Sequence, residues 1–158
     1  MTKKRIAAIV IDSLFIIATL LFIFGNSLLD KRDSTDKSDN VTHIVEKLPP
    51  VQSALEEEKI TNGDVEAAVR SLAHVAEFGL LGAEVMLLVL LVGLRPLSLS
   101  AFLPFFFCLI IGLADECLQL KTDRAAEVVD VLKDFAGSLF GGGGVLVIYG
   151  LRRFSKKT

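Results

Sequence analysis

The chain has 158 residues, of which 52% are hydrophobic and 23% are charged, and its formal net charge is only −2. Soluble domains reach about 45–50% apolar residues only when glycine is included, whereas this chain exceeds that before its 12 glycines are counted. The composition excludes a disordered chain, a coiled coil, a disulfide scaffold and a nucleic-acid reader that depends on a strong positive field. Apolar and charged residues must be segregated along the sequence, as is typical of an integral membrane protein.

Four apolar stretches, at residues 6–24, 75–94, 97–114 and 135–151, are long enough to cross a bilayer. A hydrocarbon core of about 30 Å requires roughly 17–25 helical residues. We therefore predict an all-α fold, a polytopic membrane protein with four transmembrane helices in a single membrane domain, residues 1–158. The first stretch has a basic start, but its core is longer than that of a signal peptide and no small-residue cleavage site follows. We interpret it as an uncleaved anchor.

Basic residues predict the orientation of the spans. Because short basic flanks stay in the cytoplasm, we predict a multi-pass protein of the cell membrane (inner or plasma membrane) with both termini cytoplasmic. The polar insert 25–74 and the connection 115–134 then face outward. The two termini and the turn at 94–97 together hold eight basic residues and no acid, namely Lys3, Lys4, Arg5, Arg95, Arg152, Arg153, Lys156 and Lys157.

The outward insert is predicted to contain local structure. Apolar residues within 41–48 follow the i, i+3, i+4, i+7 pattern of a short amphipathic helix, which Pro49-Pro50 would end. Such a helix can lie on the outer leaflet or cover the bundle as a lid, and the sequence does not separate the two. Further on, the apolar period of the second span already begins near Asp64. We predict that the second helix starts there, with Asp64 as its N-cap.

Polar residues at the outer ends of the second, third and fourth spans form three helical stripes. Ionisable groups at membrane depth are costly and face the bundle interior, where they pair or line a cavity. We therefore expect the three stripes to meet in one candidate site. Its residues are Arg70, His74 and Glu77 on the second span, Asp115, Glu116 and Gln119 on the third, and Arg124, Asp130 and Asp134 before and on the fourth.

The chemistry of this cluster stays open at this point. His74 or a carboxyl group can act as a general base. Arg70 and Arg124 can bind a phosphate or carboxylate of a substrate. The alternative is a salt-bridge network that only fixes the register of the helices, but so many ionisable groups at one depth exceed what register requires. The carboxylates that can hold a divalent cation as cofactor, together with the histidine, are Asp115, Glu116, Asp130 and Asp134.

Further predictions concern polar, cysteine and glycine residues within the spans. Glu84 is expected to be protonated or paired with another helix, and Asp12 to face water near the cytoplasmic end of the first span. Cys108 and Cys117 lie on opposite faces of one helix, beyond disulfide reach, so both are expected to be free thiols. The run Gly141–Gly144 lies where close contact between helices requires small residues.

Around these residues the sequence resembles the VanZ-like family of small bacterial membrane proteins. The resemblance runs through residues 70–82, RSLAHVAEFGLLG, and 112–141, GLADECLQLKTDRAAEVVDVLKDFAGSLFG. Family members similarly have a His before an aromatic-Gly/Leu stretch, then Asp-Glu-x-x-Gln, an Arg, and Asp-Val-x-x-Asp-x-x-Gly before the last span. The segment 25–69 is longer and more acidic than in a minimal member. The matching positions are His74, Glu77, Asp115, Glu116, Gln119, Arg124, Asp130, Asp134, Gly137 and Gly141.

The resemblance implies a role at the cell envelope. The founding member is associated with resistance to teicoplanin, a glycopeptide that acts on cell-wall material outside the membrane. Three hypotheses remain: a membrane enzyme that modifies a lipid-linked wall precursor or lipid-anchored wall polymer, a non-enzymatic binding, interaction or structural protein, and a small transporter or proton-linked channel. The transporter is disfavoured because polar residues stop near the outer third, apart from Glu84 and Asp12.

Overall fold

The computed structural model describes residues 2–28, 41–57, 59–94, 97–122 and 128–155, and no strand occurs among them. This confirms the predicted all-α fold. The long helices are α1 (Lys3–Ser27), α4 (Asn62–Val92), α6 (Leu103–Gln119) and α7 (Val128–Ser155). The first, second and fourth of these, and the segment Ser98–Gln119 that contains α6, are long and apolar enough to cross a membrane. The chain is a multi-pass membrane protein with four such helices in its described part.

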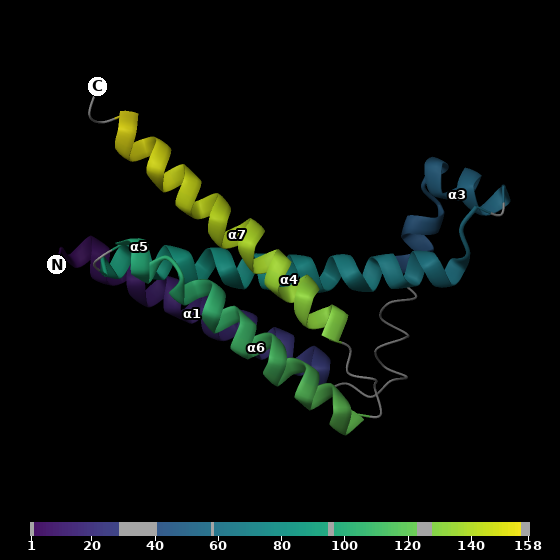
Figure 1. The fold of residues 1–158 in the computed structure, drawn as a ribbon, viewed down its shortest axis with the longest axis horizontal. Coiled ribbons are helices and arrows are strands. Elements are labelled where there is room, and N and C mark those ends of the chain that lie inside the picture. Colours follow the sequence, from purple (N-terminus) through teal and green to yellow (C-terminus); the bar gives the residue numbers. More distant parts are fainter. Residues whose placement is uncertain (1, 29–40, 58, 95–96, 123–127, 156–158) are drawn as a thin grey trace.

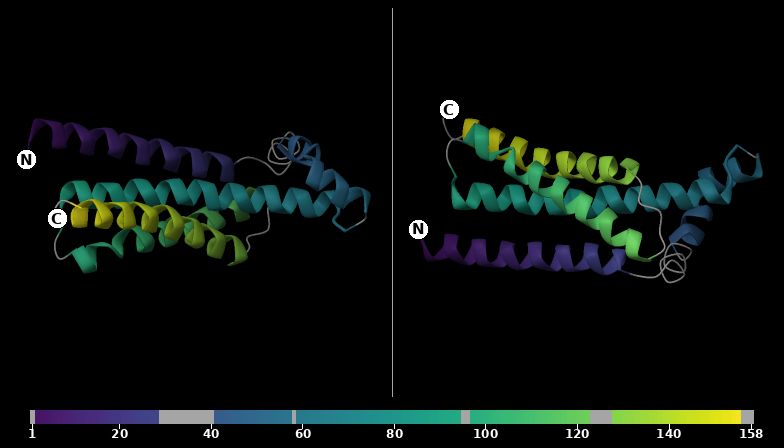
Figure 2. Two further views of the ribbon diagram at one scale, coloured as in Figure 1. Left: turned by 90° about the horizontal axis from the view of Figure 1, so that it is seen from above. Right: turned by 60° about the horizontal axis from the view of Figure 1, so that its bottom comes forward.

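The four long helices run side by side, and both termini lie at the same end of the bundle (Figures 1 and 2). At the opposite end α6 finishes and α7 begins (Figure 1). The first turns of α4 project beyond this end, beside the short helix α3 (Pro49–Glu56) (Figure 1). We call this the distal end of the bundle.

The segment before α4 contains two short helices, where the sequence predicted one. Residues 41–46 form the predicted amphipathic helix. The two prolines do not simply end it, because Pro49 and Pro50 form the first turn of α3, with Leu48 as its extended N-cap residue. Proline suits this position, since its fixed φ is helical and the first turn needs no backbone N–H donor. Two further short elements are α5 (Leu97–Ser100) and the 3-10 helix η1 (Leu120–Thr122).

The start of α4 is a capping box. The predicted helix start near Asp64 is confirmed, but the N-cap residue is Thr61 rather than Asp64. The Thr61 hydroxyl accepts a hydrogen bond from the Asp64 backbone N–H at 3.3 Å, and the Asp64 carboxylate accepts one from the Thr61 N–H at 2.8 Å. Each residue thus satisfies a backbone donor of the other.

Helices α4 and α7 approach to backbone contact because glycines line their crossing. An added Cβ on Gly82 would lie 2.6 Å from a carbonyl oxygen of α7, and one on Gly141 would overlap the carbonyl oxygen of Gly79. Small residues at such a crossing are typical of membrane helix pairs. The prediction of close contact is confirmed for Gly141 and Gly142 but is wrong for Gly143 and Gly144, where an added Cβ meets nothing within 4 Å.

An apolar cluster fills the centre of the bundle between α1, α4 and α6. It consists of Ile16, Ile23, Phe78, Leu81 and Cys108, all buried. Phe78 follows the candidate site residue at position 74 by about one helical turn, so the cluster begins directly beneath the polar stripes. Cys108 is a free thiol, as is the exposed Cys117, which confirms the expectation that the two are not bonded.

Candidate functional site

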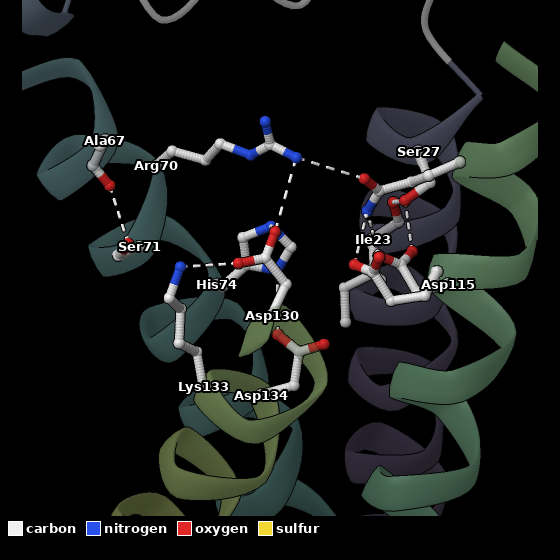
Figure 3. Close-up of polar contacts among 12 residues, drawn as sticks. Ile23, Ser27, Ala67, Arg70, Ser71, His74, Asp115, Asp130, Lys133 and Asp134 are labelled. Carbon is white, nitrogen blue, oxygen red and sulfur yellow. Dashed lines mark hydrogen bonds and ion pairs between the residues drawn. The ribbon is translucent and has the colours of Figure 1, made fainter. Parts of the chain in front are cut away.

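Four helices contribute polar side chains to one cluster at the distal end of the bundle (Figure 3). The structure brings together all of the predicted site residues that it describes, and Arg124 lies outside the described residues. The three stripes meet because glycine contacts hold α7 against α4, while α6 packs on both. The cluster comprises Asn26 and Ser27 of α1, Arg70, His74 and Glu77 of α4, Asp115, Glu116 and Gln119 of α6, and Asp130, Lys133 and Asp134 of α7.

His74 lies between two carboxyl groups of α7. Its Nδ1 is 2.9 Å from Asp134 Oδ1, a hydrogen-bond distance, and its Nε2 is 3.9 Å from Asp130 Oδ2. The two aspartates are four residues apart, so they project from the same face of α7 one turn from each other. The imidazole is therefore hydrogen-bonded to α7 through Nδ1, and its Nε2 faces a second carboxyl group of the same helix.

Asp130 also binds the two cationic side chains of the cluster. Lys133 Nζ lies 2.6 Å from Asp130 Oδ1, and Arg70 Nη2 lies 3.5 Å from Asp130 Oδ2 (Figure 3). Arg70 also reaches α6, where it donates to Gln119 Oε1 at 3.5 Å. The guanidinium thus connects α4, α6 and α7. The charge of Asp130 is compensated by these cations before any ligand is considered.

The α6 side of the cluster is held by amide and hydroxyl donors. Gln119 Nε2 donates to Asp115 Oδ2 at 2.9 Å and to Glu116 Oε1 at 3.3 Å. Ser27 Oγ of α1 donates to Asp115 Oδ1. Asn26 of α1 donates in turn to Glu77 Oε1 at 3.3 Å, so α1 is joined to both α4 and α6.

Carboxyl groups outnumber cations in the described part of the cluster. A buried charge is costly unless a counter-charge or hydrogen bonds compensate it. Asp134 is only 1% exposed, and its Oδ2 has no hydrogen-bond partner among the described residues. The arrangement therefore favours uptake of protons or of a cation. The carboxyl groups are those of Glu77, Asp115, Glu116, Asp130 and Asp134, and the cationic or titratable groups are those of Arg70, Lys133 and His74.

A surface pocket of about 280 Å³ opens above the cluster on the α4–α7 side. Its charged lining consists of Arg70, Lys133, Asp130 and Glu66, and Gly63, Ala67 and Ser71 of α4 complete its wall. The Nε of Arg70 is buried and has no hydrogen-bond partner among the residues described. The pocket thus presents an arginine and a lysine, together with two carboxylates, at the surface of the distal end.

The chain matches the model of the VanZ/LLP1 family over residues 13–149. It belongs to this family. The match begins within α1, ends within α7 and includes every residue of the cluster, so the VanZ-like resemblance predicted from the sequence is confirmed. No curated protein and no solved structure matches the chain significantly.

Sequence analysis missed three members of the cluster in this VanZ/LLP1 protein, namely Asn26, Ser27 and Lys133. Lys133 was not singled out, although its i, i+3 spacing from Asp130 is the spacing of a helical ion pair. Asn26 and Ser27 were assigned to the polar segment after the first span, whereas α1 continues to Ser27 and carries both residues into the bundle. A polar residue in the last turn of an apolar helix was the available signal.

The two deeper carboxyl groups of the VanZ/LLP1 chain lie at the α1–α4 contact. Glu84 accepts a hydrogen bond from Thr19 Oγ1 at 3.1 Å, which confirms that it pairs with another helix. The prediction that Asp12 faces water is wrong, because its side chain is buried with the face of α1 that also carries Ile16 and Thr19. The apolar cluster separates these carboxyl groups from the distal site.

Proposed function

We propose that this VanZ/LLP1 family member is a bacterial cell-membrane protein whose distal polar cluster faces outward. In this orientation the cluster binds a phosphate-bearing head group of an envelope component. The orientation rests on the basic residues at the opposite end, where Lys3, Lys4 and Arg5 begin α1 and Arg152 and Arg153 end α7. Short basic flanks are retained in the cytoplasm, so the end that carries them is the inner one.

The observation that carries the proposal is that Arg70 and Lys133 both line the distal pocket. Asp130 holds both cations in place, at 3.5 Å and 2.6 Å. A guanidinium forms two parallel hydrogen bonds to phosphate oxygens, and an ammonium adds a compact point charge. A phosphate that enters the pocket would replace the Asp130 carboxylate as the acceptor for the Arg70 and Lys133 donors. Lipid-linked wall precursors and lipid-anchored wall polymers present phosphate at this depth of the outer leaflet.

Two other hypotheses receive less support. A transporter needs a polar route between the two ends, but Ile23, Phe78 and Leu81 fill the centre of the described bundle. A purely structural network explains the ion pairs between helices, yet it does not account for a surface pocket into which both Arg70 and Lys133 open beside Asp130 and Glu66. We further propose that any tolerance of lipid-tailed glycopeptides such as teicoplanin arises from binding at this surface, and that it is lost together with Arg70.

Binding of a lipid phosphate by the purified protein tests this proposal. In detergent, wild-type protein is expected to bind a short-chain phosphatidic acid and not the corresponding uncharged diacylglycerol. A hydrogen bond to a charged group contributes about 1.5–3 kcal/mol, so Arg70→Ala and Lys133→Ala should each weaken binding by roughly ten- to a hundredfold. Lys121→Ala removes the same charge from an exposed residue outside the pocket and should leave binding unchanged.

Native mass spectrometry or fluorescence titration can measure this binding. Equal affinities for the lipid phosphate in the wild type, Arg70→Ala and Lys133→Ala would contradict the proposal. So would an equal loss in Lys121→Ala, because the effect would then follow net charge rather than the pocket.

A further inference from the structure

A buried part of the cluster has the donor set of a metal site. His74, Asp115 and Asp134 come from α4, α6 and α7, and one ligand atom of each lies within 4.8 Å of the other two. All three residues are buried. We propose that these three side chains bind a divalent transition-metal ion, Mn²⁺ or Zn²⁺, beneath the phosphate pocket.

An unsatisfied oxygen points to a ligand at this place independently of the donor set. Asp134 Oδ2 is fully buried and has no hydrogen-bond partner among the described residues, although Oδ1 of the same group is bonded to His74. A buried acceptor without a partner is unfavourable, and more so when the group is charged. A cation coordinated by Asp134 would remove this penalty and offset the excess of carboxylates around it.

The ligand atoms of a neighbouring set, His74, Glu116 and Asp130, also lie within 4.8 Å of one another. The charges around this set are unfavourable for a metal ion. Asp130 is already bound to Lys133 at 2.6 Å and to Arg70 at 3.5 Å, so a cation there would meet two fixed positive charges. Asp115 and Asp134 form no ion pair with a lysine or arginine in the described part of the chain. The observations therefore favour the set that contains these two aspartates.

The surroundings of the three ligands orient them as a second coordination shell does. Ser27 Oγ and Gln119 Nε2 each donate to one oxygen of Asp115, and each oxygen keeps a further lone pair for a metal. With His74 Nδ1 on the ion in place of its hydrogen bond to Asp134 Oδ1, the imidazole proton is on Nε2, which faces Asp130 at 3.9 Å. A ligating histidine whose other nitrogen faces a carboxylate is the usual arrangement in metal sites.

The donor types indicate which ion is bound. Ca²⁺ and Mg²⁺ prefer all-oxygen sites, whereas an imidazole with carboxylates suits Mn²⁺ or Zn²⁺. Three protein ligands leave a coordination position open, as in catalytic zinc sites. That position would take a phosphate oxygen of the head group, and only in this last step does the inference rest on the proposed function.

Metal titration of the full-length protein in detergent, stripped with EDTA and without added lipid, tests the inference. Mn²⁺ is followed by the paramagnetic resonance of the free ion and Zn²⁺ by calorimetry. We expect one ion per wild-type chain. Loss of a second-shell partner lowers metal affinity by about 10–100-fold, so we expect a loss of this size in Gln119→Ala. Asp115→Asn and Asp134→Asn each remove a ligand, so their metal affinity should be lower still.

Glu84→Gln is the matched control, because Glu84 is a buried carboxyl group of α4 outside the cluster and this variant should bind the ion as wild type does. Bound metal should raise the Tm of the wild type but not that of Asp134→Asn, since a ligand stabilises only the state that binds it.

Three results would overturn the inference: a wild type that binds no ion at one per chain, wild-type affinity in Asp134→Asn, or a loss confined to Glu116→Gln and Asp130→Asn. The wild-type stoichiometry decides the question even where a variant fails to fold. Lipid-phosphate binding by Arg70 and Lys133 is measured separately in EDTA, so failure of the metal site and failure of the proposed function give different results.

Discussion

Gly141→Ala is expected to destabilise the protein, whereas Gly144→Ala, the same substitution three residues further along α7, is expected to be neutral or stabilising. A Cβ at position 141 would overlap the carbonyl oxygen of Gly79, so α4 and α7 would have to separate. Overpacking of this kind costs about 1–3 kcal/mol and more where backbone is displaced. At position 144 nothing lies within 4 Å of the added atom, and alanine gains up to about 1 kcal/mol over glycine in a helix.

The free energy of unfolding in mixed detergent micelles, or the Tm of each purified variant, measures this difference. Because both changes add the same methyl group to the same helix, detergent effects on helix propensity cancel between them. Equal stability of the two variants would show that α4 and α7 do not meet in backbone contact, and the convergence of the polar stripes would lose its support.

Removal of the imidazole of His74 is expected to have the second large effect. His74→Leu leaves Asp134 buried without its partner at 2.9 Å, and breaking one side of a buried pair costs about 3–5 kcal/mol. Replacing both partners by apolar residues of similar size is often close to neutral. The double variant His74→Leu/Asp134→Leu should therefore recover much of the stability that His74→Leu loses.

A double-mutant cycle in EDTA measures this coupling without a contribution from bound metal. Coupling between residues in contact is expected to be about 0.5–3 kcal/mol. The cycle between His74 and Glu84 serves as the control, since they lie on one helix ten positions apart and share no hydrogen-bond partner in the described structure. Additive effects for His74 and Asp134 would contradict the pairing.

The spans and the stripes of the candidate site were predictable because both follow from periodicity. Hydropathy over about 20 residues identified the four spans, and the helical repeat placed His74 and Glu77 on one face. Ionisable groups at membrane depth must face protein, which predicted that the stripes meet. Individual partners could not be predicted, since the 2.9 Å contact of His74 with Asp134 rather than with Asp115 depends on the rotation of α7 against α4.

The errors arise where tertiary contact or local backbone overrides the pattern. Asp12 is polar in an apolar helix, and only the contact of α1 with α4 decides that it is buried. Gly143 and Gly144 read as contact residues in sequence, but α7 turns them away from its neighbours in the described structure. Pro49 could end one helix or begin the next, and in this chain it begins α3.

The side of the membrane that carries the distal site is the claim on which the account depends most. In a Cys117→Ser background, cysteines introduced at Ser53 of α3 and at Ser155 at the end of α7 mark opposite ends of the bundle, and both positions are exposed. The remaining Cys108 is buried. A membrane-impermeant maleimide is applied to intact spheroplasts and, in parallel, to lysed ones. The account predicts that Ser53→Cys is labelled in intact spheroplasts and Ser155→Cys only after lysis. Labelling of Ser155→Cys in intact spheroplasts, with Ser53→Cys protected until lysis, would place the site in the cytoplasm and contradict the account.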